Sequence, residues 1–116
     1  MDIGDRIKEL SKRAMVAKQK ALTEEATKTS VLLPFIQFLE FDPFNLDEVV
    51  PEYTADVGVK KGEKVDFAIK IVGSAAILIE AKPVAATLGT SQFSQLFRYF
   101  SVTNAKVAIL TNGIEY

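Results

Sequence analysis

Two segments near the middle of the chain have the alternation of a β-hairpin, and this pattern restricts the fold most. In residues 64–72, apolar side chains at every second position face one way, and polar or small ones face the other. Gly73-Ser74 is typical of a turn, and the apolar run in residues 75–82 predicts a second strand, which Pro83 ends. A chain with this hairpin at its centre is expected to build a sheet and cover it with helices.

Helical patterns come before the hairpin. Residues 3–22 predict an amphipathic helix, with apolar positions in steps of four and three and basic residues on the remaining surface. We expect its apolar stripe to lie on the core, although the heptad spacing also fits a seam for a second chain. Thr23 is expected to cap a second helix with Glu24 and Glu25 in its first turn. Pro34 should kink that helix or end a first segment of it.

The remaining elements complete a mixed sheet. Residues 48–53 predict a strand that Pro51 places at an edge or a bend. Residues 87–100 predict a helix, residues 106–111 predict a short buried strand, and the last three residues suggest the start of another. The order is helices, a three-strand meander, a crossover helix and a further strand. The fold class is therefore α/β (α+β), a mixed sheet flanked by helices.

Composition limits the available chemistry. The chain has no cysteine and no histidine, and its net charge is −1. Disulfides and thiolate sites are excluded, and hydrolysis would have to use carboxylates, lysine or a hard oxygen-bound metal. The near-neutral net charge argues against a protein that binds nucleic acid through bulk positive charge alone. No apolar run is long enough to span a bilayer, and the amino terminus lacks a signal-peptide pattern, so no membrane and a cytoplasmic location are expected.

Three ionisable residues stand out on the predicted hairpin. Glu80 and Lys82 are two apart on one strand and point to the same face, and Asp66 lies on the preceding strand. A two-residue turn at Gly73-Ser74 would pair Asp66 with Ala81, which faces the other way. We therefore predict an odd-length turn or a bulge near Gly73 that brings Asp66 and Glu80 together.

Two interpretations of these residues follow from spacing alone. Two acids and a lysine on strands are ordinarily solvated or salt-bridged. However, Glu80 ends the apolar run of residues 75–79, and a carboxylate in such surroundings is costly unless something pairs with it. A divalent metal would pair with it fully, and Lys82 only partly. The spacing leaves both interpretations open.

An ordered set of motifs resembles the amino-terminal nuclease domain of type I restriction enzyme R subunits and, more closely, its small relatives. The resemblance covers Thr23 to the end of the chain, which is expected to form one PD-(D/E)xK nuclease-like domain, residues 23–116, preceded by the amphipathic helix of residues 1–22. The motifs are Glu25-Ala26-Thr27-Lys28, Leu33-Pro34-Phe35, residues 49–58 and 62–69, Ile79-Glu80-Ala81-Lys82, residues 95–100 and Leu110-Thr111-Asn112-Gly113.

The resemblance implies a restriction-endonuclease-like fold and a Mg²⁺-dependent cut of DNA, with Mn²⁺ as a substitute. Asp66 and Glu80 would hold the metal, with the Ala81 carbonyl completing the set. Lys82 would orient or help deprotonate the attacking water. Glu25 matches the family's helix-borne acid near the metal, although it also simply suits a helix amino terminus.

The resemblance also implies residues that contact substrate. Gln95 and Tyr99 match a QxxxY motif, on one helix face by their spacing, although Tyr99 is also suited to the core. Lys60, Lys61 and Lys64 form a basic loop that can approach a phosphate backbone, although a solvated loop is the ordinary interpretation.

Departures from the family pattern restrict the function. Val65 stands where the motif's name has proline, and no GxxxxGK[ST] loop is present, so the ATP-driven motor of a full R subunit is absent. The end at Tyr116 suggests either a domain truncated at its carboxyl terminus or a minimal version of the domain, and a homodimer would cover the missing sheet edge. Motor or specificity subunits are further expected partners. The alternative function is a catalytically silent DNA-binding or assembly domain with the same fold.

Overall fold

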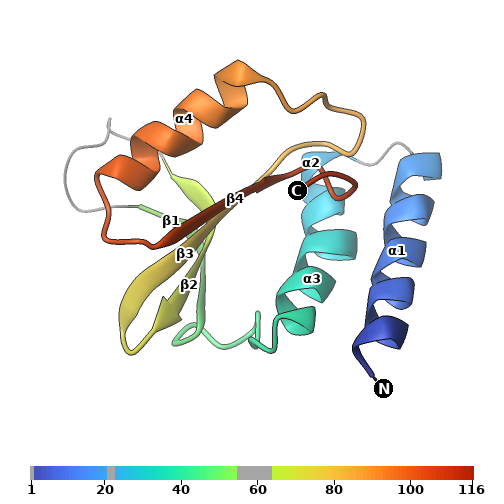
Figure 1. The fold of residues 1–116 in the computed structure, drawn as a ribbon, viewed down its shortest axis with the longest axis horizontal. Helices are drawn as coiled ribbons and strands as arrows, with labels where there is room; N and C mark the ends of the chain where they lie inside the picture. The colour runs from blue at the N-terminus through green and yellow to red at the C-terminus, as the bar shows by residue number, and fades with distance from the viewer. Residues whose placement is uncertain (1, 21–22, 55–63) are drawn as a thin grey trace.

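The computed structural model describes residues 2–20, 23–54 and 64–116 as a four-stranded mixed sheet with helices on both faces (Figure 1). The sheet order is β1-β2-β3-β4, with β3 and β4 parallel and the other neighbours antiparallel. This arrangement confirms the predicted fold class and the meander followed by a crossover. The elements are α1 (Ile3–Lys20), α2 (Glu24–Thr27), η1 (Lys28–Leu32), α3 (Leu33–Phe38), β1 (Val49–Tyr53), β2 (Val65–Ile71), β3 (Ser74–Ala81), α4 (Thr90–Ser101) and β4 (Val107–Thr111).

The two faces of the sheet bury separate clusters, as strand alternation requires. On one face, Ala68 and Leu78 pack with Leu96 of α4. On the other face, Ile69 and Ile79 pack with Ile36 of α3. The central strands β2 and β3 therefore pack against a buried cluster on each face.

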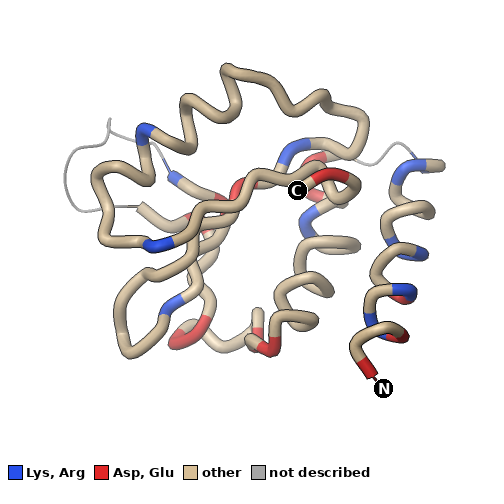
Figure 2. Tube along the Cα trace, in the orientation of Figure 1, with Lys and Arg blue, Asp and Glu red and all other residues tan. Residues whose placement is uncertain are grey.

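Helix α1 lies on the other helices rather than on the sheet (Figure 1). Ala17 is buried with Val31 and Val84, and the Arg6 guanidinium donates to the Phe38 carbonyl at 2.7 Å. Ile3 of the predicted apolar stripe is 66% exposed. Lysine and arginine residues occur along this helix (Figure 2). Within the described residues, no helix is long and apolar enough to cross a membrane.

The second predicted helix is continuous but changes geometry along its length. Thr23 caps it, as predicted, by accepting a hydrogen bond from the Ala26 N–H. The π-helical turn η1 precedes Pro34, and the Leu33 N–H bonds to the Lys28 carbonyl, five residues back. Pro34 has no N–H to offer the preceding turn, and a wide turn there accommodates the missing donor. Thus Pro34 changes the helical pitch without ending the helix.

The hairpin turn lies one residue earlier than the sequence suggested. Ile71 pairs with Ser74, so Val72 and Gly73 form the turn, with φ values of 51° and 79°. Positive φ at both positions matches the twist of the flanking strands. The predicted turn at Gly73-Ser74 is therefore wrong by one residue, because Val72, which is 99% exposed, adopts an unusual conformation for a β-branched residue.

A β-bulge then corrects the register. Lys70 pairs with Ala75 but Ile69 pairs with Ile77, so Ala76 is an extra residue on β3. Beyond it, Phe67 pairs with Ile79, which puts the next residues, Asp66 and Glu80, opposite each other. The predicted bulge is confirmed.

The chain after β4 turns back instead of starting another strand. The Asn112 side chain accepts from the N–H groups of Ile114 and Glu115, and Thr111 donates its hydroxyl to the Glu115 carbonyl. The expected further strand at residues 114–116 is therefore wrong, because these local bonds use the groups that a ladder would need.

We expect Gly113→Ala to lower the free energy of unfolding by about 1–3 kcal/mol. Gly113 has φ +90°, and an added Cβ would lie 3.4 Å from methyl groups of Thr27 and Val31. Urea denaturation would measure the change. Gly73→Ala is the matched control, because Gly73 has φ +79° but open space around its Cβ position. Equal losses in the two variants would show that crowding against Thr27 and Val31 contributes nothing.

Candidate functional site

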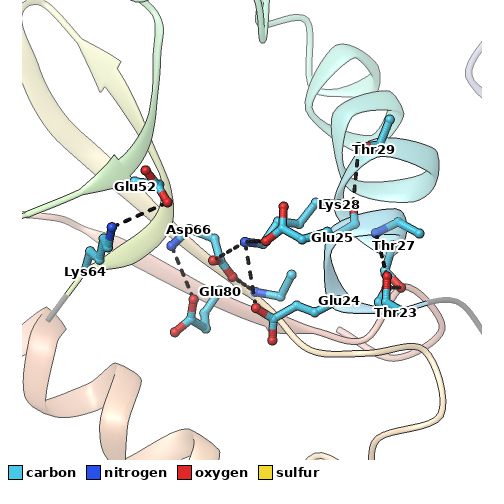
Figure 3. Close-up of polar contacts among 12 residues, drawn as sticks. Thr23, Glu24, Glu25, Thr27, Lys28, Thr29, Glu52, Lys64, Asp66 and Glu80 are labelled. Atoms are coloured by element: carbon cyan, nitrogen blue, oxygen red, sulfur yellow. Dashed lines mark hydrogen bonds and ion pairs between the residues drawn. The ribbon is translucent and has the colours of Figure 1, made fainter. Parts of the chain in front are cut away.

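Asp66 and Glu80 lie where the pairing of β2 and β3 ends (Figure 3). The Asp66 N–H donates to Glu80 Oε1 at 3.2 Å, and the Ala81 N–H donates to Asp66 Oδ2 at 2.7 Å. Each carboxylate thus bonds the backbone of the opposite strand, where a regular ladder would have paired backbone with backbone.

The electrostatics of the pair favour one shared proton. Glu80 is 9% exposed. Burial, the hydrogen bond with Asp66 and the charge of Asp66 raise the pKa of Glu80 to about 8, against the opposing charge of Lys82. Burial also disfavours the charge of Asp66, but hydrogen bonds from Glu80, Lys28 and the Ala81 N–H outweigh it and lower the pKa of Asp66. Burial and the charge of Asp66 thus oppose ionisation of Glu80, whereas the hydrogen bonds to Asp66 favour the ionised form of Asp66.

Lys28 supplies a positive charge that the sequence analysis did not assign to the site. Its Nζ lies 2.7 Å from Asp66 Oδ1, 2.9 Å from Glu25 Oε1 and 3.8 Å from Glu24 Oε2 (Figure 3). Burial lowers the pKa of Lys28, but the hydrogen bonds to Asp66 and Glu25 raise it above its ordinary range. In the sequence, the spacing of Lys28 from Glu24 and Glu25 is that of an ordinary surface pair on a helix.

Lys82 and Ala81 lie at the same strand end. The Lys82 N–H donates to the Thr111 carbonyl at 2.9 Å, extending the pairing of β3 with β4 past Ala81. Ala81 is fully buried, and the half-buried Lys82 is close enough for its charge to oppose the rise in the pKa of Glu80. The structure therefore brings Asp66, Glu80, Ala81 and Lys82 together.

The other predicted site residues lie around this group or away from it. Glu25 is exposed and reaches Asp66 only through Lys28. Gln95 is exposed on α4. Lys64 forms an ion pair with Glu52 at 3.5 Å. Lys60 and Lys61 lie outside the described residues.

Tyr99 is part of the core. It is 3% exposed, packs in the cluster of Leu96 and Leu110, and donates its hydroxyl to the Tyr53 carbonyl at 3.0 Å. Tyr99 therefore packs in the core, which was the alternative to substrate contact that the sequence left open. Whether it also contacts substrate stays a prediction.

The oxygen donors present suit a hard cation. Two carboxylates with a neighbouring carbonyl match Mg²⁺, which uses one or two carboxylates and takes its other ligands from water and phosphate. Among residues 2–20, 23–54 and 64–116, no group of three or more acidic side chains is arranged to hold a metal ion. A cation site at these strand ends would therefore have to use both Asp66 and Glu80.

The fold is that of an α+β domain, a four-stranded mixed sheet flanked by helices, with two acids and a lysine where its central strands end. The family model described as type I restriction enzyme R protein N terminus matches residues 23–116, so the chain belongs to that family. This membership assigns the domain to restriction systems, which act on DNA together with other subunits. Comparison with curated proteins and with solved structures found no match.

We expect the stability of the chelator-treated protein to fall as pH rises from about 5 to 8. The folded protein keeps the Glu80 proton up to about pH 8, whereas an unfolded glutamate loses it near 4.5, so folding takes up a proton between these values. The slope for one proton is at most about 1.4 kcal/mol per pH unit. The lowered pKa of Asp66 acts only below 3.8, outside this window.

Urea denaturation at several pH values would measure this dependence. Glu80→Gln is the matched control, since it cannot lose a proton. The same slope in that variant would contradict the assignment to Glu80.

Proposed function

We propose that this chain is a metal-dependent DNA endonuclease domain of a restriction system. The observation that carries the proposal is the meeting of Asp66 and Glu80 at the opened strand end, with Lys82 two residues further on. Membership of the R-subunit family supports DNA as the substrate. The reaction is hydrolysis of a phosphodiester bond.

Each residue has a defined task in this reaction. The carboxylates of Asp66 and Glu80, with the Ala81 carbonyl, would hold Mg²⁺ or Mn²⁺. The metal, when bound, supplies positive charge to the phosphate oxygens and makes water more acidic. Lys82 orients the water that attacks phosphorus and stabilises charge on the phosphate as the bond to the leaving oxygen breaks. Such carboxylate and lysine chemistry suits a chain without histidine.

The reaction also requires Glu80 to lose its proton. Glu80 would ionise on holding a divalent cation, because a neighbouring positive charge favours the ionised carboxylate. No phosphate-binding loop occurs in this sequence, so these residues do not themselves supply the translocating motor of a restriction system. A second copy of the chain is a further proposed partner.

A plasmid nicking assay with Mg²⁺ or Mn²⁺ tests the proposal. Wild type should convert supercoiled plasmid to the nicked form, and Asp66→Ala and Lys82→Ala should lose at least about a hundredfold in rate. Lys106→Ala, at an exposed position before β4, is the control. Equal rates in wild type, Asp66→Ala and Lys82→Ala would refute the assigned site.

A catalytically silent DNA-binding or assembly domain is the second candidate function. The Lys28–Asp66 ion pair favours it, because that pair neutralises Asp66 without a metal. Gel-shift binding of DNA without nicking under any metal condition would identify this function.

A further inference from the structure

The contact between Lys28 and Asp66 differs from the other ion pairs of Lys28. Both side chains are well shielded, at 15% and 14% exposed, whereas the Glu25 side chain is 83% exposed. Shielded charges interact more strongly than surface charges, which are screened by water and salt. Asp66 is thus the strongest partner of Lys28, and the two glutamates of α2 are secondary ones.

Asp66 is also the carboxylate that both cations need. Its Oδ2 accepts the Ala81 N–H at 2.7 Å, and its Oδ1 holds the Lys28 ammonium at 2.7 Å. Each carboxylate oxygen has a second acceptor position, so a divalent cation can bind Oδ1 or Oδ2, but in either place it would lie close to the ammonium. Two cations at one carboxylate repel each other, so the lysine and the metal compete.

We propose that Lys28 is a built-in competitor of the divalent cation at Asp66, and that a DNA phosphate takes over its ammonium and so couples metal binding to DNA binding. This inference rests on the proposed function and gives Lys28 a direct contact with the substrate. The outcome is a site with low metal affinity until DNA is present.

The surroundings of Lys28 suit such a transfer. A phosphate that is to be hydrolysed must approach Asp66 and Glu80, and so comes within reach of the ammonium beside Asp66. Lysine binds phosphate as a mobile point charge on a flexible stem. Glu24 and Glu25, one turn earlier on the helix, hold the ammonium near the strand ends after it leaves Asp66 (Figure 3). Displacement therefore requires a side-chain movement and leaves the fold intact.

Calcium titration calorimetry tests the competition. Without DNA, Lys28→Met should bind Ca²⁺ about tenfold more tightly than wild type, a typical size for coupling between two sites. Lys28→Arg, which keeps the charge, should bind as weakly as wild type. Lys106→Met, which removes an exposed lysine outside the site, should also match wild type.

The same titration in the presence of a short DNA duplex tests the transfer. DNA should raise the Ca²⁺ affinity of wild type and of Lys28→Met by different factors, and the factor for wild type should be about ten times the factor for Lys28→Met. The contrary result is that DNA raises the Ca²⁺ affinity of both proteins by the same factor, while Lys28→Met binds Ca²⁺ more tightly than wild type without DNA. That result would overturn the transfer of the ammonium to phosphate and would support only the competition between Lys28 and the cation. Thermal melting establishes that each variant is folded. If Lys28→Met does not fold, Lys28→Gln takes its place in both titrations.

Ca²⁺ binding by Lys28→Met that is equal to or weaker than that of wild type overturns the proposal. Failure of the proposed function looks different. In that case, no variant binds Ca²⁺ and wild type does not nick plasmid, or Asp66→Ala nicks as fast as wild type.

Discussion

Glu80→Gln should reduce plasmid nicking by at least about a hundredfold while making the protein more stable at pH 8. Nicking falls because the amide cannot replace a charged metal ligand. Stability rises because burial and Asp66 oppose ionisation of Glu80, and glutamine removes that cost. The glutamine oxygen can still accept the Asp66 N–H, and its amide group can donate to Asp66.

Nicking assays and thermal melts of the same preparations would measure both effects, and the expected gain in stability is about 1 kcal/mol or more. Glu9→Gln, at an exposed position of α1, is the control for removal of one negative charge. An unstable Glu80→Gln would mean that the ionised carboxylate is needed for folding. Wild-type nicking by that variant would exclude Glu80 as a metal ligand.

The hairpin shows how far sequence reasoning reached. Alternation identified both strands, and the demand that Asp66 and Glu80 share a face predicted a bulge, which occurs at Ala76. The turn itself was misplaced by one residue. Val72 adopts positive φ at a cost that local propensity does not anticipate, and the pairing of complete strands imposes it.

Lys28 shows where sequence reasoning ended. On a helix, its spacing from Glu24 and Glu25 indicates a solvated pair of little energetic value. Its main partner, Asp66, is on a strand far along the chain, so only tertiary packing brings them together. The π-helical turn that begins at Lys28 is also hard to foresee, because Pro34 is compatible with a kink, a break or a wide turn.

Tyr99→Ala should lower the free energy of unfolding by about 3–5 kcal/mol, the cost of removing a large buried aromatic side chain. Tyr99→Phe should lose only about 1 kcal/mol, for the hydrogen bond to the Tyr53 carbonyl. We expect Tyr99→Phe to nick plasmid at nearly the wild-type rate, because that hydroxyl already serves the fold. Urea denaturation and nicking rates on folded protein would measure the two effects.

Gln95→Ala is the comparison that separates packing from substrate contact. Gln95 lies one turn before Tyr99 on α4 but is exposed, so its removal should leave stability within about 0.5 kcal/mol of wild type. If the two residues act together on DNA, Tyr99→Phe and Gln95→Ala will both raise the DNA concentration needed for half-maximal nicking. That result would contradict a purely structural Tyr99 and would show that α4 presents this face to the substrate.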